Sequence, residues 1–126
     1  MESPVGCVVH VVDDDEAVRD SMGALLESHG LEVRGYASAR EFLLTNPKQR
    51  CGCMLLDLHM PGMGGLELLD LLRAEGSKLP VIAITGRSDD LLRERVARAG
   101  AVILLDKPVA EDILLNSLVA AFSLRF

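Results

Sequence analysis

Short apolar runs alternate with amphipathic segments along almost all of the 126-residue chain, and this alternation constrains the fold more than any other feature. The apolar runs are short and mostly continuous, which favours strands buried in a parallel sheet. They cover residues 7–12, 31–36, 53–57, 80–84 and 101–105. The segments between them space their apolar residues as helices do. They cover residues 16–29, 38–45, 64–75, 88–99 and 110–124.

A strand followed each time by a helix predicts an α/β fold, in which helices cover both faces of a parallel sheet. No G-x-G-x-x-G follows the first strand, which argues against a dinucleotide-binding fold. Asp15 and Glu16 stand where the first helix begins, and we interpret them as caps or partners of the helix dipole. His10 lies inside the first strand, and we interpret it as a structural histidine.

Composition excludes some classes of function. The net charge of −6 argues against direct binding of nucleic acid by this chain, since phosphate backbones attract Lys and Arg. No apolar run approaches the roughly 20 residues that span a membrane, and the N-terminus does not resemble a signal peptide. We therefore expect a cytoplasmic protein without a membrane partner. The odd count of three cysteines predicts reduced, structural thiols.

Polar residues follow four of the five predicted strands. The first strand is followed by Asp13 and Asp14, the third ends at Asp57, the fourth precedes Thr85, and Lys107 comes shortly after the fifth. Ligands of open parallel sheets bind outside the carboxyl ends of the strands, where the strand order reverses. A strand order of 2-1-3-4-5 would bring these five side chains to one edge of the sheet.

These residue types form a coherent chemical set. Several carboxylates in one crevice repel each other, which raises their pKa values or demands a cation. Hard oxygen ligands suit Mg²⁺, with Mn²⁺ as the alternative. An ionised Asp57 could act as a nucleophile and form an aspartyl-phosphate. Lys107, the metal and the Thr85 hydroxyl could together position the phosphoryl oxygens and neutralise their charge. Taken alone, however, an aspartate after a strand is equally well a turn residue or a helix cap.

Four segments give the chain a specific resemblance over essentially its whole length. They are HVVDDDEAVR (10–19), LLDLHMPGMGGLELL (55–69), VIAITG (81–86) and DKP (106–108). In this order and spacing they resemble the response-regulator receiver domain of two-component signalling. The MPGMGG segment is similar to the FixJ-type subgroup, whose members commonly carry a DNA-binding helix-turn-helix further along. We expect a single receiver domain over residues 1–126, with no output domain in this chain.

The resemblance implies a flavodoxin-like (βα)5 doubly wound sandwich, with a five-stranded parallel sheet of order 2-1-3-4-5. It also implies that Asp57 accepts a phosphoryl group from a phosphohistidine on a sensor histidine kinase or phosphotransfer protein. Asp13 and Asp14 match the acidic pair that holds Mg²⁺ (Mn²⁺ is possible), with Asp14 as the likelier direct ligand. Asp57 and the backbone carbonyl of His59 would complete the protein ligands.

The remaining matches concern the phosphoryl group. The resemblance implies that Thr85 hydrogen-bonds it, that Lys107 pairs with it, and that the small Gly86 leaves it accessible. Lys107-Pro108 matches a site with a cis peptide bond. A receiver of this kind is a regulatory phospho-acceptor rather than a metabolic enzyme, and it assists its own phosphorylation and dephosphorylation. The expected output is control of transcription.

One departure affects the expected switch. Relatives often carry an aromatic residue three positions before the lysine, where this chain has Leu104. We hypothesise that switching relies on Thr85 and loop movement, and that the face formed by residues 88–99, 101–105 and 110–124 binds an output domain or a second copy. The alternative is a pseudo-receiver, a phosphate-independent interaction or dimerisation module. The His59 side chain is either a control on the hydrolytic water or simply exposed.

Overall fold

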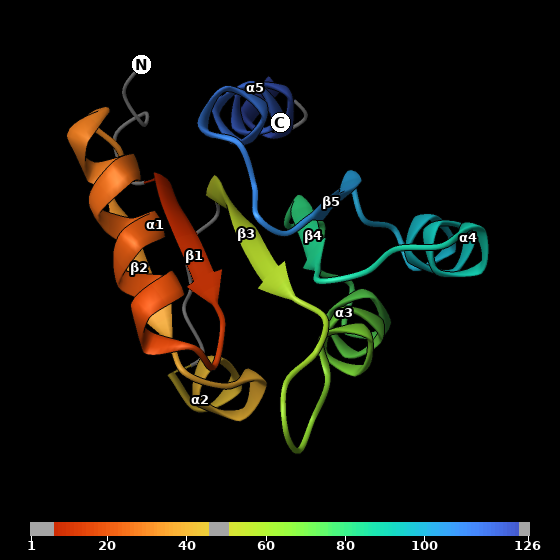
Figure 1. Ribbon diagram of the computed structural model, residues 1–126. Helices are drawn as coiled ribbons and strands as arrows, with labels where there is room; N and C mark the ends of the chain where they lie inside the picture. Colours follow the sequence, from red (N-terminus) through yellow and green to blue (C-terminus); the bar gives the residue numbers. More distant parts are fainter. Residues whose placement is uncertain (1–6, 46–50, 124–126) are drawn as a thin grey trace.

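The computed structural model describes residues 7–45 and 51–123, and in it five parallel strands lie between two layers of helices (Figure 1). The strands are β1 (Cys7–Val12), β2 (Val33–Tyr36), β3 (Cys51–Asp57), β4 (Val81–Thr85) and β5 (Ile103–Asp106). The helices are α1 (Glu16–Ser28), α2 (Ala39–Thr45), α3 (Gly65–Ala74), α4 (Asp90–Arg98) and α5 (Glu111–Ser123). The sheet order is β2-β1-β3-β4-β5, which confirms the predicted fold.

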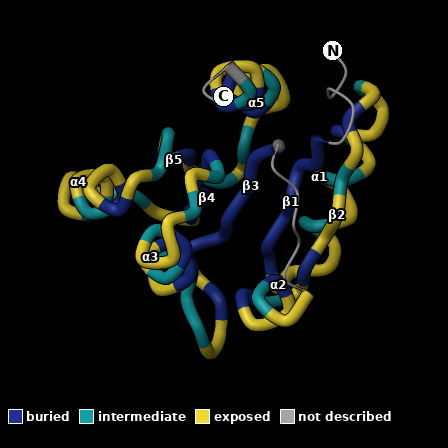
Figure 2. The backbone as a smooth tube through the Cα atoms, turned by 180° about the vertical axis from the view of Figure 1, so that it is seen from behind, coloured by how far each residue is buried: buried dark blue, intermediate teal, exposed yellow. Residues whose placement is uncertain are grey.

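The core has two layers because successive strand residues point to opposite faces of the sheet. Val9 and Val11 of β1 face α1 and α5, where they join a cluster with Leu26 and Leu118. The opposite face packs against the other three helices. Its residues fall in two clusters, one with α2 and α3 and one with α4. The inner strands β1, β3 and β4 are buried along their described lengths (Figure 2).

Side-chain caps fix where several helices begin. Asp15 confirms its predicted role, because its carboxylate accepts a hydrogen bond from the Val18 N–H at 3.2 Å. Ser38 acts in the same way before α2, accepting from the Glu41 N–H at 3.0 Å. Asp89 caps α4. Each cap satisfies a backbone donor that the first helical turn leaves without an intrahelical partner.

Three strands start two residues away from their predicted starts, and the first of them, β2, starts at Val33 rather than at residue 31. β5 starts at Ile103 rather than at residue 101, because the N–H of Ala101 still bonds the carbonyl of Val96 in α4 and pairing with β4 begins only at Ile103. β3 starts two residues early, at Cys51, and pairs with Cys7 of β1. Residue 124 of the predicted last helix lies outside the described residues. Within the described ranges, no helix is long and apolar enough to cross a membrane.

The expectation of reduced thiols is wrong for Cys7. Cys7 is disulfide-bonded, and the pairing of β1 with β3 sets its backbone opposite that of Cys51. Cys53 is a free thiol in the core, and burial raises its pKa to about 12. A thiol with that pKa stays protonated at neutral pH, so Cys53 behaves as a small apolar core residue.

The structural role predicted for His10 is confirmed. The ring is buried, and its Nδ1 lies 3.0 Å from the hydroxyl of Tyr36. Phe42 meets both rings edge-on, with centroid separations of 5.5 Å to His10 and 5.1 Å to Tyr36. Burial, and secondarily the charge of Arg34, lowers the pKa of His10 from 6.5 to about 4. The imidazole is therefore neutral in the folded protein at neutral pH.

This lowered pKa predicts a loss of stability in mild acid. Between pH 6.5 and pH 4 the unfolded chain binds a proton at His10 that the folded protein excludes, so the free energy of unfolding falls as the pH falls. The full loss is about 3 kcal/mol, from roughly 1.4 kcal/mol per pKa unit. Chemical denaturation of wild type and His10→Gln across this range measures it. A difference between the two that does not change with pH would contradict the prediction.

Candidate functional site

The predicted site residues converge at the carboxyl edge of the sheet. Asp13 directly follows β1, Asp57 is the last residue of β3, Thr85 is the last residue of β4, and Lys107 directly follows β5. Parallel pairing of β1 with β3, β3 with β4 and β4 with β5 aligns these strand ends. Asp14 joins them from the turn before α1. Side chains up to 94 residues apart thus share one small region.

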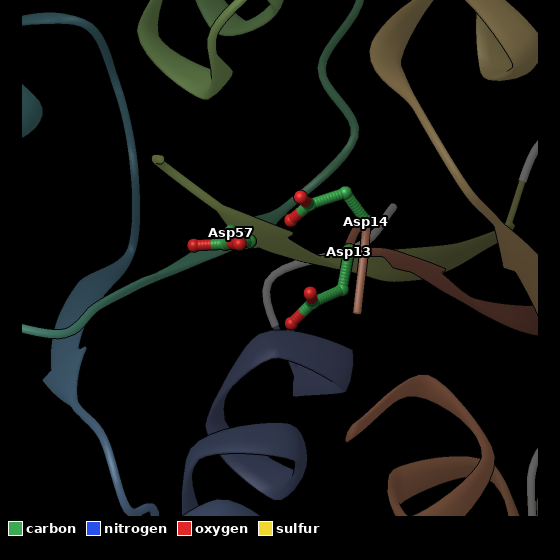
Figure 3. Close-up of side chains that lie close together, drawn as sticks. All are labelled: Asp13, Asp14 and Asp57. Carbon is green, nitrogen blue, oxygen red and sulfur yellow. The ribbon is translucent and has the colours of Figure 1, made fainter. Parts of the chain in front are cut away.

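Three carboxylates form the centre of this region. Asp13, Asp14 and Asp57 each place an oxygen within 4.8 Å of the others, and Figure 3 shows the three side chains gathered beside the ends of β1 and β3. Asp13 and Asp57 are 2% and 4% exposed, whereas Asp14 is open to solvent. The cluster is therefore anchored in the protein on one side and reachable from solvent on the other.

Lys107 supplies positive charge beside the cluster. Its Nζ lies 3.2 Å from an oxygen of Asp13 and 3.5 Å from an oxygen of Asp57. Partial burial opposes the charge on Lys107, but the hydrogen bonds and charges of Asp13 and Asp57 outweigh it and raise the pKa of the ammonium group. Lys107 therefore stays protonated and bridges the ends of β1 and β3.

Asp57 is held in a setting that makes its charge costly. Burial is the main cause that raises the pKa of this carboxyl group, and the charges of Asp13 and Asp14 add to it. A hydrogen bond from the His59 N–H, at 3.2 Å, and the charge of Lys107 act in the opposite direction without cancelling the rise. The carboxylate is thus poorly stabilised by its surroundings and gains by binding further positive charge.

The residues present fit a divalent cation. Three carboxylates face one ammonium group, so the cluster carries excess negative charge when all four groups are ionised. Oxygen donors of this kind suit Mg²⁺ and Mn²⁺ rather than softer metals. The exposed side of Asp14 leaves room for the waters that Mg²⁺ usually keeps. A ligand role for the carbonyl of His59 remains a prediction.

Thr85 is fully buried at the end of β4, and its hydroxyl makes three close polar contacts. The His59 Nε2 lies 2.8 Å from Thr85 Oγ1. The hydroxyl can donate to the carbonyl of Arg87 at 3.2 Å, and it accepts from the Arg87 N–H at 3.3 Å. Gly86, next in the chain, is exposed, and a Cβ at this position would meet no heavy atom within 4 Å. Position 86 thus faces open space, and the role of Gly86 in keeping the phosphoryl group accessible remains a prediction.

The predicted cis bond between Lys107 and Pro108 is present. Two other supporting residues were not predicted from the sequence. Arg19 of α1 donates from Nη1 to the backbone carbonyl of Asp13 at 2.7 Å. Its position four residues after the Asp15 cap is the signal that could have placed it over this loop. Asp106 accepts from the N–H and hydroxyl of Ser88, at 3.0 and 2.9 Å, and so ties the end of β5 to the segment before α4.

The fold and site define a flavodoxin-like domain with an aspartate cluster at the switch point of its sheet. A family model described as the response regulator receiver domain matches residues 9–119. The chain belongs to this family, and it is of the FixJ type. It is 45% identical over 105 residues to the transcriptional regulatory protein FixJ of Azorhizobium caulinodans, an alignment covering 83% of this chain and 50% of that protein.

Two further comparisons agree. The C4-dicarboxylate transport transcriptional regulatory protein DctR of Rhodobacter capsulatus is 39% identical over 117 residues, which cover 91% of this chain and 59% of DctR. The crystal structure of FixJ-N has a TM-score of 0.88 and 34% identity, covering 100% of this chain and 98% of that one. The chain thus spans between half and three-fifths of the length of these two regulators.

Proposed function

We propose that Asp57 is the phospho-acceptor of this receiver domain. The observation that carries the proposal is the placement of a buried carboxylate beside two acidic neighbours and 3.5 Å from the Lys107 ammonium group. The family is that of response regulators, whose receivers are regulatory phospho-acceptors rather than metabolic enzymes. The comparisons thus favour phosphoacceptance over the alternative of a phosphate-independent pseudo-receiver.

The proposed transfer takes place at one oxygen of Asp57. This oxygen attacks the phosphorus of a phosphohistidine, an O–P bond forms as the N–P bond breaks, and the leaving imidazole keeps the electron pair and takes up a proton. Lys107 pairs with the transferred group, and the Thr85 hydroxyl donates a hydrogen bond to it. The same groups favour the later attack of water, so the domain would assist its own dephosphorylation.

We assign the cation site to Asp13, Asp14, Asp57 and the backbone carbonyl of His59, with Mg²⁺ as the ion and Mn²⁺ as a possible substitute. A bound cation supplies positive charge to the phosphoryl oxygens as they approach. Asp13 is fixed for this role because its Oδ1 accepts from the Asp15 N–H at 2.9 Å while Arg19 holds its carbonyl. The chain itself therefore preorganises the ligands before a donor binds.

The proposed donor is a sensor histidine kinase or a phosphotransfer protein, and the proposed output is control of transcription, as the names of DctR and FixJ indicate for those proteins. Because transcription takes place on DNA in the bacterial cytoplasm, we propose a cytoplasmic location. We propose the α4–β5–α5 face as the contact with an output domain or a second copy. Large apolar side chains are exposed there: Leu91, Ile103, Ile113 and Val119. A groove of about 200 Å³ runs beside Ile103 and Leu104.

Intact-protein mass spectrometry after incubation with acetyl phosphate and Mg²⁺ tests the proposal. We expect one added phosphoryl group with Mg²⁺ and none in the presence of a chelator, because the excess negative charge of the cluster would then repel the donor. NMR spectra with beryllofluoride provide a second test that does not depend on the lifetime of the adduct. If neither method shows a response, the chain is a pseudo-receiver.

A further inference from the structure

The hydroxyl of Thr85 is saturated before any phosphoryl group is present. A hydroxyl has one proton to donate and two lone pairs that accept. The Arg87 N–H occupies one lone pair, and the carbonyl of Arg87 can only accept the proton. The third partner is the His59 Nε2, which lies 2.8 Å away. It either donates a hydrogen bond to the remaining lone pair or accepts the hydrogen bond that the hydroxyl donates. In both arrangements the Thr85 hydroxyl already donates its hydrogen bond, either to the carbonyl of Arg87 or to the Nε2 of His59.

The proposed function requires this proton elsewhere. Asp57 lies opposite Ile84 in the pairing of β3 with β4, so a phosphoryl group on Asp57 would stand beside the end of β4. To donate to it, Thr85 must give up a partner and turn. His59 is two residues beyond Asp57 and exposed, yet its ring reaches back to cover a hydroxyl that is itself 0% exposed.

From these contacts we infer that the His59 side chain is a latch that holds Thr85 in the unphosphorylated arrangement. This inference rests on the proposed phospho-acceptor function. His59 is a positioning residue here, since it acts through Thr85. The latch opposes recruitment of Thr85 to the phosphoryl group. Part of the free energy gained by binding that group is therefore needed to break the contact between His59 and Thr85. Leu104, which stands where relatives often have an aromatic residue, packs beside Ala83 and Val96 and offers no hydrogen bond to replace the latch.

The test compares His59→Leu with His59→Gln, two side chains of similar size of which the second retains a hydrogen-bonding end. Beryllofluoride affinity in Mg²⁺, read by NMR titration, measures the cost of recruiting Thr85 without any contribution from hydrolysis. We expect His59→Leu to bind about fivefold more tightly than wild type, the effect of one net hydrogen bond. We expect His59→Gln to stay near the wild-type affinity.

Amide spectra without donor or metal provide the readout that is independent of phosphoacceptance. The signals of Thr85 and Arg87 should move in His59→Leu and return toward wild-type positions in His59→Gln. Equal beryllofluoride affinities of His59→Leu and wild type would overturn the latch, as would equally weakened binding by both variants. If wild type itself fails to respond to beryllofluoride while the donor-free signals behave as expected, the proposed function fails and the His59–Thr85 contact stands as a structural one.

Discussion

Asp57→Asn should abolish the phosphoryl adduct on the intact protein, even with excess acetyl phosphate and Mg²⁺. The amide that replaces the carboxylate lacks the anionic oxygen that attacks phosphorus and is a poor ligand for the cation. Mass spectrometry measures the loss, and phosphopeptide mapping of wild type locates the adduct. Asp20→Asn, at an exposed position of α1, is the matched control and should keep the adduct. An adduct on Asp57→Asn would show that another residue is the acceptor.

The same variant should be more stable than wild type at neutral pH in the absence of metal. Because the folded pKa of Asp57 lies above its ordinary value, the folded state binds the proton more tightly than the unfolded chain. Wild type therefore loses stability as the pH rises through this pKa, and the asparagine variant does not. The advantage of Asp57→Asn should disappear in acid, where Asp57 is protonated in both states, and shrink when Mg²⁺ binds wild type.

Gly65→Ala should destabilise the fold and slow phosphorylation together. A Cβ at this first residue of α3 would lie 2.5 Å from the backbone oxygen of Asp57 and 2.8 Å from the Cα of Leu58. Backbone atoms cannot turn aside as a flexible side chain does, so the turn after β3 must shift. We expect a loss of about 3 kcal/mol, typical of overpacking a tight site. Denaturant unfolding and the rate of adduct formation measure the two effects.

The neighbouring glycine supplies the control for this prediction. A Cβ at Gly64 would meet the carbonyl oxygen of Leu58 at 3.6 Å, an ordinary contact, and Gly64 is the N-cap of α3. Gly64→Ser should therefore preserve both stability and phosphorylation, since serine suits that position. If Gly65→Ala proved as stable and as reactive as Gly64→Ser, the close packing of α3 against the Asp57 turn would not control the nucleophile.

The alternation of strands and helices sufficed to predict the sheet, because parallel strands buried on both faces leave a continuous apolar signal. It also placed Asp57, Thr85 and Lys107 at one edge, since strand ends align in a parallel sheet. The limits of β5 were less predictable. Ala101 and Val102 are as apolar as the strand itself, and only pairing with β4 decides where the ladder starts.

Contacts that depend on side-chain orientation could not be predicted in this way. The sequence left open whether His59 was exposed or near the reaction site, and in the structure the residue is exposed while its Nε2 lies 2.8 Å from Thr85 Oγ1. Likewise, nothing in the spacing of Ser88 and Asp106 indicates their two hydrogen bonds, which join segments 18 residues apart. Such contacts arise from the tertiary arrangement of loops rather than from any local pattern.

The corner formed by His10, Tyr36 and Phe42 has an optical consequence. The sequence has one tyrosine and no tryptophan, so intrinsic ultraviolet emission comes from Tyr36. Tyr36 ends β2, at the opposite edge of the sheet from β5. Native fluorescence therefore reports on the packing around His10 and is insensitive to rearrangement near α4 and β5. An engineered fluorophore such as Leu104→Trp would make that distant edge visible, with Tyr36 as the internal reference.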